Sequence, residues 1–343
     1  MRKLMNTLFV TLPMAYLALD GENVVVLDDN TKKMRVPLHN LEQIITFGYL
    51  GASPALMAAC TNQGIDICFM NEHGRFLAKV TGKTKGNVLL RTAQYRKFDD
   101  HDFSCKLAKV LIASKVANSR WVLERTCRDY PLRVNLEALK AKSNSLKSHL
   151  ELVRESANID QLRGYEGVCA AEYYSAFNHM ILTKKEEFVF QGRTRRPPLD
   201  KVNALLSFMY SMLRVDVTAG LEAVGLDPYV GFMHSMRPGR ESLALDIMEQ
   251  LRAPIADRFV LTIINKGIVQ PDDFIVEENG AVRLTDTGRK NVLGAWHNKK
   301  QETITHPFLC EKVPWGLVPY VQALLLVRYL RGDLDDYAAF LWK

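Results

Sequence analysis

The hydrophobic pattern of the chain changes once, near residue 88. Before this point, short runs of β-branched and aromatic residues are separated by turn-forming pairs such as Asp20-Gly21 and His73-Gly74, which is typical of strands. After it, hydrophobic residues recur every three to four positions, which is typical of amphipathic helices. We predict strands over 16–19, 24–27, 33–36, 44–47, 65–70 and 76–80, and helices over 104–127, 135–153, 158–180, 199–223, 242–265 and 318–329.

One helix interrupts the strand region. Ser53 is a suitable N-cap, Pro54 suits the first turn, and Gly64 suits the position after the last turn, so they bracket a helix over 55–62. The change of period itself predicts a domain boundary between residues 85 and 95.

Within the helical region, Asn279-Gly280 predicts a hairpin over 274–284.

The N-terminal segment superficially resembles a secretory signal, because Arg2-Lys3 precedes an apolar run over 4–19. Polar residues and Pro13 interrupt that run, and no small-x-small cleavage site follows it. We therefore interpret the segment as a first strand. Since the chain has no stretch of about 18 uninterrupted apolar residues, we expect no membrane span.

Composition adds weak constraints. The chain has 343 residues, 48% of them hydrophobic and 24% charged, which is ordinary for a folded protein of up to two domains. Its net charge of +7 favours an anionic partner such as nucleic acid, although many basic proteins bind none. The six cysteines form no C-x-x-C pair, so we expect reduced core residues and a cytoplasmic location.

A carboxylate stands on an otherwise apolar helical stripe. Glu166 recurs at helical spacing with Leu162, Cys169 and Tyr173. A carboxylate in such a position needs a cation or a proton. Two interpretations are open, a metal ion or an ion pair with a neighbour such as Arg163.

A second group of polar residues follows a loop. His234 precedes the turn at Pro238-Gly239, Ser242 is a suitable N-cap, and Asp246 and Glu249 share one face of the next helix. One imidazole with carboxylates suits Mn²⁺ or Mg²⁺ better than structural zinc. Such a metal can activate a hydroxyl and stabilise the charge on a phosphodiester.

Basic residues leave further alternatives open. The helical acids can pair with Arg240 or Arg252, and a lone loop histidine is often only a hydrogen-bonded structural residue. The loop over 184–198 holds three arginines, among them Arg193 and Arg195. It suits phosphate contact, a solvated connection or a subunit contact about equally well.

Three long segments, 162–174, 195–210 and 234–252, resemble CRISPR-associated protein one, the integrase of CRISPR adaptation. The similarity extends to the N-terminal part through 71–76 and 91–95 and covers the chain up to about residue 260. The motif pattern is similar to that of type I systems, and of subtype I-C in particular.

The resemblance implies an α+β fold. A small N-terminal β-rich domain, residues 1–90, would serve dimerisation and DNA contact, and a larger all-α-helical domain, residues 91–343, would be catalytic.

The resemblance also implies a metal site. Members of the family bind a divalent metal, Mg²⁺ or Mn²⁺, through a Glu, a His and a further acid, which correspond here to Glu166, His234 and Glu249. Asp246 would be an accessory catalytic acid one turn earlier. Other members often carry Asp at the position of Glu249, which changes reach more than ligand type. Whether His234 is only a ligand or also a general acid stays open.

The implied substrate is double-stranded DNA, both the spacer precursor and the CRISPR repeat, joined by attack of a 3′-hydroxyl. The family also cleaves DNA, and it acts as homodimers bridged by CRISPR-associated protein two, in some systems with an end-trimming nuclease. For this chain we expect Arg193, Arg195, Arg237 and Arg240 to hold backbone phosphate.

Two rival functions remain. A catalytically silent basic scaffold that binds DNA and docks a partner would explain the charge, but such a protein is expected to have lost at least one of the acid and imidazole positions, and this chain has all four. A metal-dependent hydrolase of small phosphoesters fits the ligands but not the length of the matching helical segments.

Overall fold

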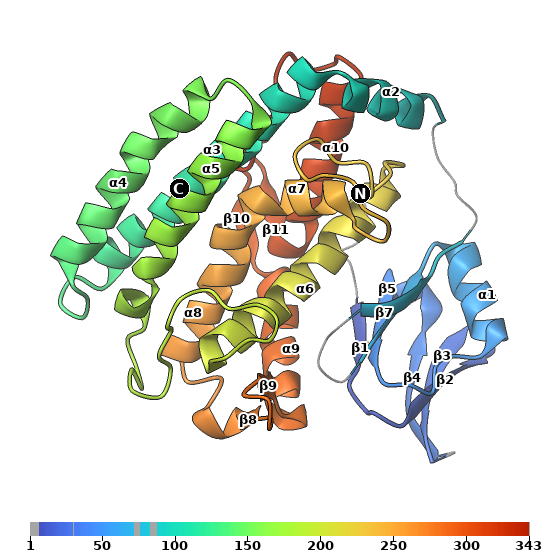
Figure 1. Ribbon diagram of the computed structural model, residues 1–343. Helices are drawn as coiled ribbons and strands as arrows, with labels where there is room; N and C mark the ends of the chain where they lie inside the picture. The colour runs from blue at the N-terminus through green and yellow to red at the C-terminus, as the bar shows by residue number, and fades with distance from the viewer. Residues whose placement is uncertain (1–6, 30, 72–75, 83–87, 343) are drawn as a thin grey trace.

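The computed structural model describes residues 7–29, 31–71, 76–82 and 88–342, and it consists of a β-rich N-terminal part and a mostly helical remainder (Figure 1). The turn expected at His73-Gly74 lies outside the described residues. The strands of the N-terminal part are β1 Thr7–Val10, β2 Ala15–Asp20, β3 Asn23–Asp28, β4 Thr31–Pro37, β5 Gln43–Phe47, β6 Asp66–Met70 and β7 Phe76–Val80, and its helix α1 is Pro54–Gln63.

These strands form two sheets. The order is β1-β5-β6-β7 in the first and β2-β3-β4 in the second. Leu17, Val24 and Ile44 lie in the core that the sheets share with α1, and all are fully buried. The capping prediction for α1 is confirmed, because Ser53 Oγ accepts from Leu56 N at 3.2 Å and Gly64 follows the helix with φ +74°.

The prediction of a single strand in the N-terminal segment is wrong in one respect, because the segment forms two strands in different sheets. Strand β1 pairs in parallel with β5, and β2 pairs antiparallel with β3. The chain reverses between them at a turn in which Ala15 N donates to Leu12 O at 3.1 Å. Pro13 lies inside this turn and has no N–H to give to a ladder, so a continuous strand is disfavoured there.

The remainder of the chain is mostly, not wholly, helical. The hairpin expected at Asn279-Gly280 is present, and a second one follows it; an all-α-helical domain is thus too strict a description. The hairpins are β8 Phe274–Val276 with β9 Val282–Leu284, and β10 Thr303–Thr305 with β11 Lys312–Pro314. The helices are α2 Val88–Asp99, α3 His101–Asp129, α4 Leu136–Glu155, α5 Ile159–Ser175, α6 Lys201–Ala223, α7 Ser242–Leu251, α8 Arg258–Asn265, α9 Asp286–Gln301 and α10 Val318–Leu330.

The helix expected over 242–265 is divided by a π-helical segment, Arg252–Asp257, which joins α7 to α8. Pro254 lies in this segment. Its ring and its missing N–H are incompatible with a regular α-helical ladder, which accounts for the local widening.

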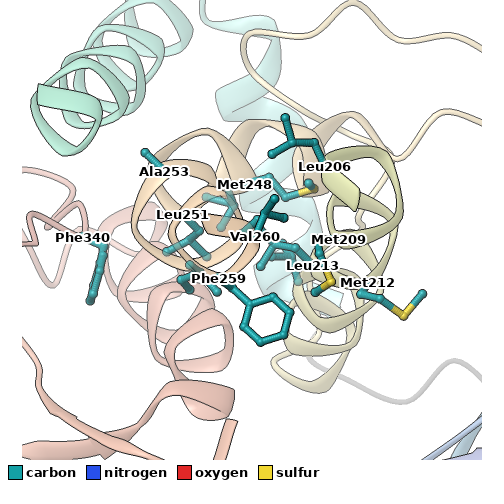
Figure 2. Packing of buried hydrophobic residues seen from close by; sticks show 14 of the residues in the cluster. Leu206, Met209, Met212, Leu213, Met248, Leu251, Ala253, Phe259, Val260 and Phe340 are labelled. Carbon is teal, nitrogen blue, oxygen red and sulfur yellow. The ribbon is translucent and has the colours of Figure 1, made fainter. Parts of the chain in front are cut away.

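The core of the helical part lies where α6, α7 and α8 meet. Figure 2 shows Leu206 and Met209 of α6 beside Met248 and Leu251 of α7 and Val260 of α8. Helix α6 is long and apolar enough to cross a membrane, but 83% of its most apolar stretch is buried inside the protein, as in a core helix. Helix α3 packs against α4, α5 and α7. This packing brings together the polar side chains of α3, α5 and α7.

Candidate metal centre

Asp246 holds the loop that carries His234. The carboxylate is fully buried on α7 and accepts hydrogen bonds from the backbone N–H groups of Phe232 at 2.6 Å and Met233 at 3.0 Å. It also accepts one from the N–H of His234 at 3.0 Å. The ring atom Nδ1 of His234 lies 2.6 Å from Asp246 Oδ1. Both carboxylate oxygens are therefore occupied, and Nε2 is the ring nitrogen that remains for other partners.

Gly231 allows the loop to approach α7 this closely. A Cβ atom at this position would lie 2.6 Å from the carbonyl carbon of Ser242 and 2.7 Å from Asp246 Oδ2. Both distances are far shorter than a carbon atom tolerates. The convergence of three N–H groups on one carboxylate thus depends on the missing side chain.

The N-cap expected at Ser242 is wrong. Ser242 is the first residue of α7, and its hydroxyl donates to Ser235 O at 3.2 Å instead of capping the helix. The cap residue is Glu241, whose carboxylate pairs with Arg214 at 2.9 Å. An N–H group in the first turn of α7 has a backbone acceptor outside the helix, because Leu243 N donates to Pro228 O at 2.9 Å.

Three helices bring two carboxylates to one cation. Lys115 of α3 contacts Glu166 Oε1 of α5, and its Nζ lies 2.7 Å from Glu249 Oε2 of α7. The other oxygen of Glu249 lies 3.0 Å from Arg252 Nη2 and 4.0 Å from His234 Nε2. Two of the side chains expected as metal ligands, Glu166 and Glu249, therefore share the ammonium of Lys115, and the third, His234, lies beside Glu249.

The partner of Glu166 is not the arginine considered from the sequence. Arg163 turns away and pairs with Asp160 at 2.9 Å while it donates to Met233 O at 2.6 Å. Glu166 keeps 26% of its side chain exposed and pairs with Lys115. The interpretation that Glu166 needs a cation is consistent with this contact, and the sequence-local candidate for that cation is wrong.

The opposite charges of this cluster stabilise one another. Burial alone would raise the pKa of Glu249, but Arg252 and Lys115 outweigh it and lower the pKa to about 2. Burial would lower the pKa of Lys115, but Glu249 and Glu166 outweigh it and raise the pKa above its ordinary value. Both groups therefore carry their charge at neutral pH.

The donor set fits a hard divalent cation, although its present geometry is that of an ion-pair cluster. Among the described residues, no three His, Cys, Asp or Glu side chains stand in a metal-binding arrangement. The ammonium of Lys115 instead lies between Glu166 and Glu249. Two carboxylates and an imidazole whose second nitrogen is held by a carboxylate are the chemistry of Mg²⁺ and Mn²⁺ sites.

Lys115 and Arg252 complete the cluster, and neither was predicted from the sequence to belong to the site. Lys115 had a recognisable signal, because it interrupts the buried stripe of α3 between Leu111 and Val122. Arg252 was considered only as a pairing partner of the acids. Its guanidinium lies over the Tyr210 ring, 4.9 Å from the centroid, and Tyr210 donates to Asp257.

The four arginines expected to contact phosphate differ in exposure. Arg193 turns inward, donates to Asn203 Oδ1 at 2.7 Å and lies over the Tyr210 ring. Arg195 and Arg237 are exposed, and Arg240 is half-buried.

The chain matches a known family over most of its length. The model of the family described as CRISPR associated protein Cas1 matches residues 8–298. The relatives include a CRISPR-associated endonuclease Cas1 of Chlorobaculum tepidum, 44% identical over 343 residues, and one of Rhodospirillum rubrum, 45% identical over 347 residues. Each alignment covers 100% of both chains.

Solved structures share the fold. A casposase bound to integration product has a TM-score of 0.85 at 23% identity, over 99% of this chain and 95% of that one. A chain of a Cas6-RT-Cas1–Cas2 complex has a TM-score of 0.83 at 24% identity, over 100% of this chain and 36% of that one. The resemblance inferred from the sequence motifs is confirmed, and the chain belongs to the CRISPR-associated protein Cas1 family.

Proposed function

We propose that the chain cleaves DNA and joins captured DNA to a CRISPR repeat, with Mg²⁺ or Mn²⁺ held by Glu166, His234 and Glu249. The observation that carries this proposal is the convergence of the three side chains, since Glu166 and Glu249 share the Lys115 ammonium and His234 Nε2 lies 4.0 Å from Glu249 Oε1. The full-length identity to proteins named CRISPR-associated endonucleases supports the reaction class. Assignment to subtype I-C stays a prediction.

Each residue of the cluster has a role that follows from its contacts. Asp246 holds the His234 ring through Nδ1, so it is a positioning residue with no oxygen left for a further ligand. Arg252 keeps Glu249 ionised. The metal, when bound, supplies a Lewis acid that stabilises the charge building on the phosphodiester and the attacking hydroxyl.

DNA backbone contact is proposed for the exposed arginines. Arg195 and Arg237 are exposed to solvent, and Arg240, which is half-buried, is kept in this set because part of its side chain still reaches solvent. Arg193 is removed from this set, because its donors serve Asn203 and Ser207 inside the protein. Exposed guanidinium groups supply the salt-dependent, sequence-independent part of DNA binding.

The remaining partners follow the family. We propose a homodimer that associates with Cas2, as in the Cas1–Cas2 complex that shares this fold, and a further end-trimming nuclease. Residues 1–90 would serve dimerisation and DNA contact, and residues 91–343 catalysis. A cytoplasmic location is consistent with six free thiols, four of them buried.

The test compares strand joining and DNA binding in Mn²⁺ for the wild type, Glu166→Ala and His234→Ala. We expect both variants to lose joining by roughly 100-fold or more while they bind DNA like the wild type. Glu172→Ala is the control, because Glu172 lies on the same helix and pairs with Lys142 at 2.8 Å outside the cluster.

Two results would overturn the proposal. Joining at the wild-type rate by Glu166→Ala and His234→Ala would exclude the metal site. Wild-type DNA binding without any joining would favour the silent scaffold.

A further inference from the structure

A cleft of about 790 Å³ lies at the junction of the β-rich part and the helical part. Its walls come from the first residues of β5 and β6, from α2, from the end of α6 and from the start of α10. Lys115, Glu166, His234 and Glu249 are absent from its lining, so the cleft is separate from the proposed metal centre. Its volume is in the range of ligand-binding sites.

Gln43 lines this cleft with an unpartnered amide. Its side chain is 2% exposed, and neither its Oε1 nor its Nε2 has a hydrogen-bond partner within the part of the chain that the structure describes. A buried amide without partners disfavours folding, and a leucine of similar volume would avoid that cost. The amide offers one acceptor and two donors side by side, which complement a peptide group.

The described side chains of the cleft are predominantly acidic. Glu42, Asp66, Glu222 and Asp227 line it, against one guanidinium, that of Arg91. The nearby Lys79 pairs with Asp66 at 3.0 Å and also contacts Glu222. On a chain of net charge +7, an acidic cleft repels a nucleic-acid backbone and attracts a cationic ligand.

Aromatic side chains add apolar surface to the same walls. Tyr95, Tyr229 and Tyr320 line the cleft, and the hydroxyl of Tyr95 donates to Asp227 Oδ2 at 3.0 Å. Tyrosine rings are well suited to the aliphatic stems and charged ends of lysine and arginine side chains.

We propose that this cleft binds an extended, lysine- or arginine-bearing peptide segment of a protein partner. A backbone amide of the segment pairs with Gln43, and its cationic side chains lie near the carboxylates. The site is a docking site for protein, distinct from the surfaces that hold DNA.

The test begins with selection of phage-displayed heptapeptides on the immobilised full chain. Enriched peptides are then synthesised with a fluorescent label, and their affinities are measured by anisotropy. We expect peptides with two or more Lys or Arg residues, which bind Gln43→Leu at least about tenfold more weakly than the wild type. Gln191→Leu, the same change at an exposed position, should bind them like the wild type.

Two further measurements distinguish a variant that has lost the peptide site in the cleft from a variant that has not folded. Gln43→Leu should be at least as stable to urea as the wild type, because it removes a buried unpaired amide. Ala219→Trp, which narrows the cleft from α6, should also lose the peptide. Both variants should join naked DNA at the wild-type rate.

Three results would overturn the proposal. Equal peptide affinity for the wild type and Gln43→Leu would exclude the amide as the recognition group. Failure to enrich any basic peptide would exclude the ligand class. A deoxyadenosine oligonucleotide that binds tenfold more weakly to Gln43→Leu, with peptides unaffected, would assign the cleft to a nucleobase.

Discussion

Asp246 is the residue on which the geometry of the site depends most. It is completely buried and accepts from three consecutive backbone N–H groups and from the His234 ring. A negative charge with four donors is far more stable in the interior than the same charge without them. The sequence placed Asp246 near the metal as an accessory acid, and its contacts make it the support of the histidine.

Asp246→Asn tests whether Asp246 acts by holding the His234 ring and its loop in place. The amide NH₂ would face N–H donors, so we expect a loss of stability of about 1–3 kcal/mol in urea unfolding. We also expect Mn²⁺ affinity, measured by calorimetric titration, to fall by about 10- to 100-fold, the usual effect of losing a partner behind a ligand.

The control for this change is Asp160→Asn, whose side chain is 90% exposed. It should alter neither stability nor Mn²⁺ affinity. Unchanged Mn²⁺ affinity in Asp246→Asn would contradict the positioning role.

The buried carboxyl group of Asp257 leads us to predict that the stability of the protein depends on pH. Burial raises its pKa to about 6, although hydrogen bonding from Tyr210 and the charge of Arg252 act in the opposite direction. The folded-state pKa therefore lies above the ordinary value near 3.8, and the stability that Asp257 contributes below pH 4 is lost as pH rises to about 6. A difference of this size corresponds to roughly 3 kcal/mol.

Asp257→Asn removes that dependence. The stability of the variant relative to the wild type should therefore rise between about pH 4 and pH 6 and level off above it. Urea unfolding at a series of pH values measures this difference. A difference that is constant with pH would show that the carboxyl group titrates alike in both states.

Sequence reasoning found the carboxylates and the imidazole of the cluster but not the cation between them. Glu166, His234 and Glu249 stand in recognisable motifs, because polar residues on apolar stripes are conspicuous along the chain. The contact with Lys115 joins residues 51 positions apart in sequence, on helices whose packing order no local pattern reveals. Arg163 was the nearest candidate in sequence, but Asp160 and a backbone carbonyl already engage it.

At the scale of elements, the loop before α7 depends on a close approach that only glycine permits. Gly231→Ala would place a methyl group against the backbone of Ser242 and should destabilise the protein by about 1–3 kcal/mol, with loss of strand joining. The matched control is Gly164→Ala in α5, where nothing lies within 4 Å of the added Cβ. That change should stabilise the protein by about 0.5–1 kcal/mol.

Thermal or urea unfolding of both glycine variants measures the contrast. The two substitutions are chemically identical, but we expect one to lower the stability of the protein and the other to raise it. Equal effects on stability would contradict the contact that places the loop.

Helices whose hydrophobic residues recur regularly were predicted from the sequence, and helices with few hydrophobic residues were missed. Helices α3, α4, α5 and α6 lie within a few residues of their predicted ranges. Helix α9 was missed because Gly288 and Gly294 and its many polar residues obscure the helical period, while Gly288 packs against Asp273. Helix α2 was missed because only Leu90 and Gln94 are buried along it.

At the scale of the whole molecule, α3 connects the cluster of Lys115, Glu166 and Glu249 to the end of the described chain. Asn118 lies one turn beyond Lys115 and donates to Gln250 O and Phe340 O, each at 2.7 Å. Trp342 N donates back to Asn118 Oδ1 at 2.9 Å. The C-terminal segment also packs against α7, the helix that carries Glu249, because Phe340 N donates to Gln250 Oε1 at 2.7 Å. The packing order of these helices was not predicted from the sequence, since a helical period carries no packing information.

The central claim is that Glu166 of α5, Glu249 of α7 and His234 of the loop before α7 form a single divalent-metal site. Titration of Mn²⁺ into the full chain, followed by electron paramagnetic resonance, counts the bound ions directly. We predict one bound ion per chain. We also predict a loss of affinity greater than about 100-fold in Glu166→Gln and Glu249→Gln, with Glu172→Gln unchanged. No bound Mn²⁺ in the wild type, or equal binding by all four proteins, would contradict the account.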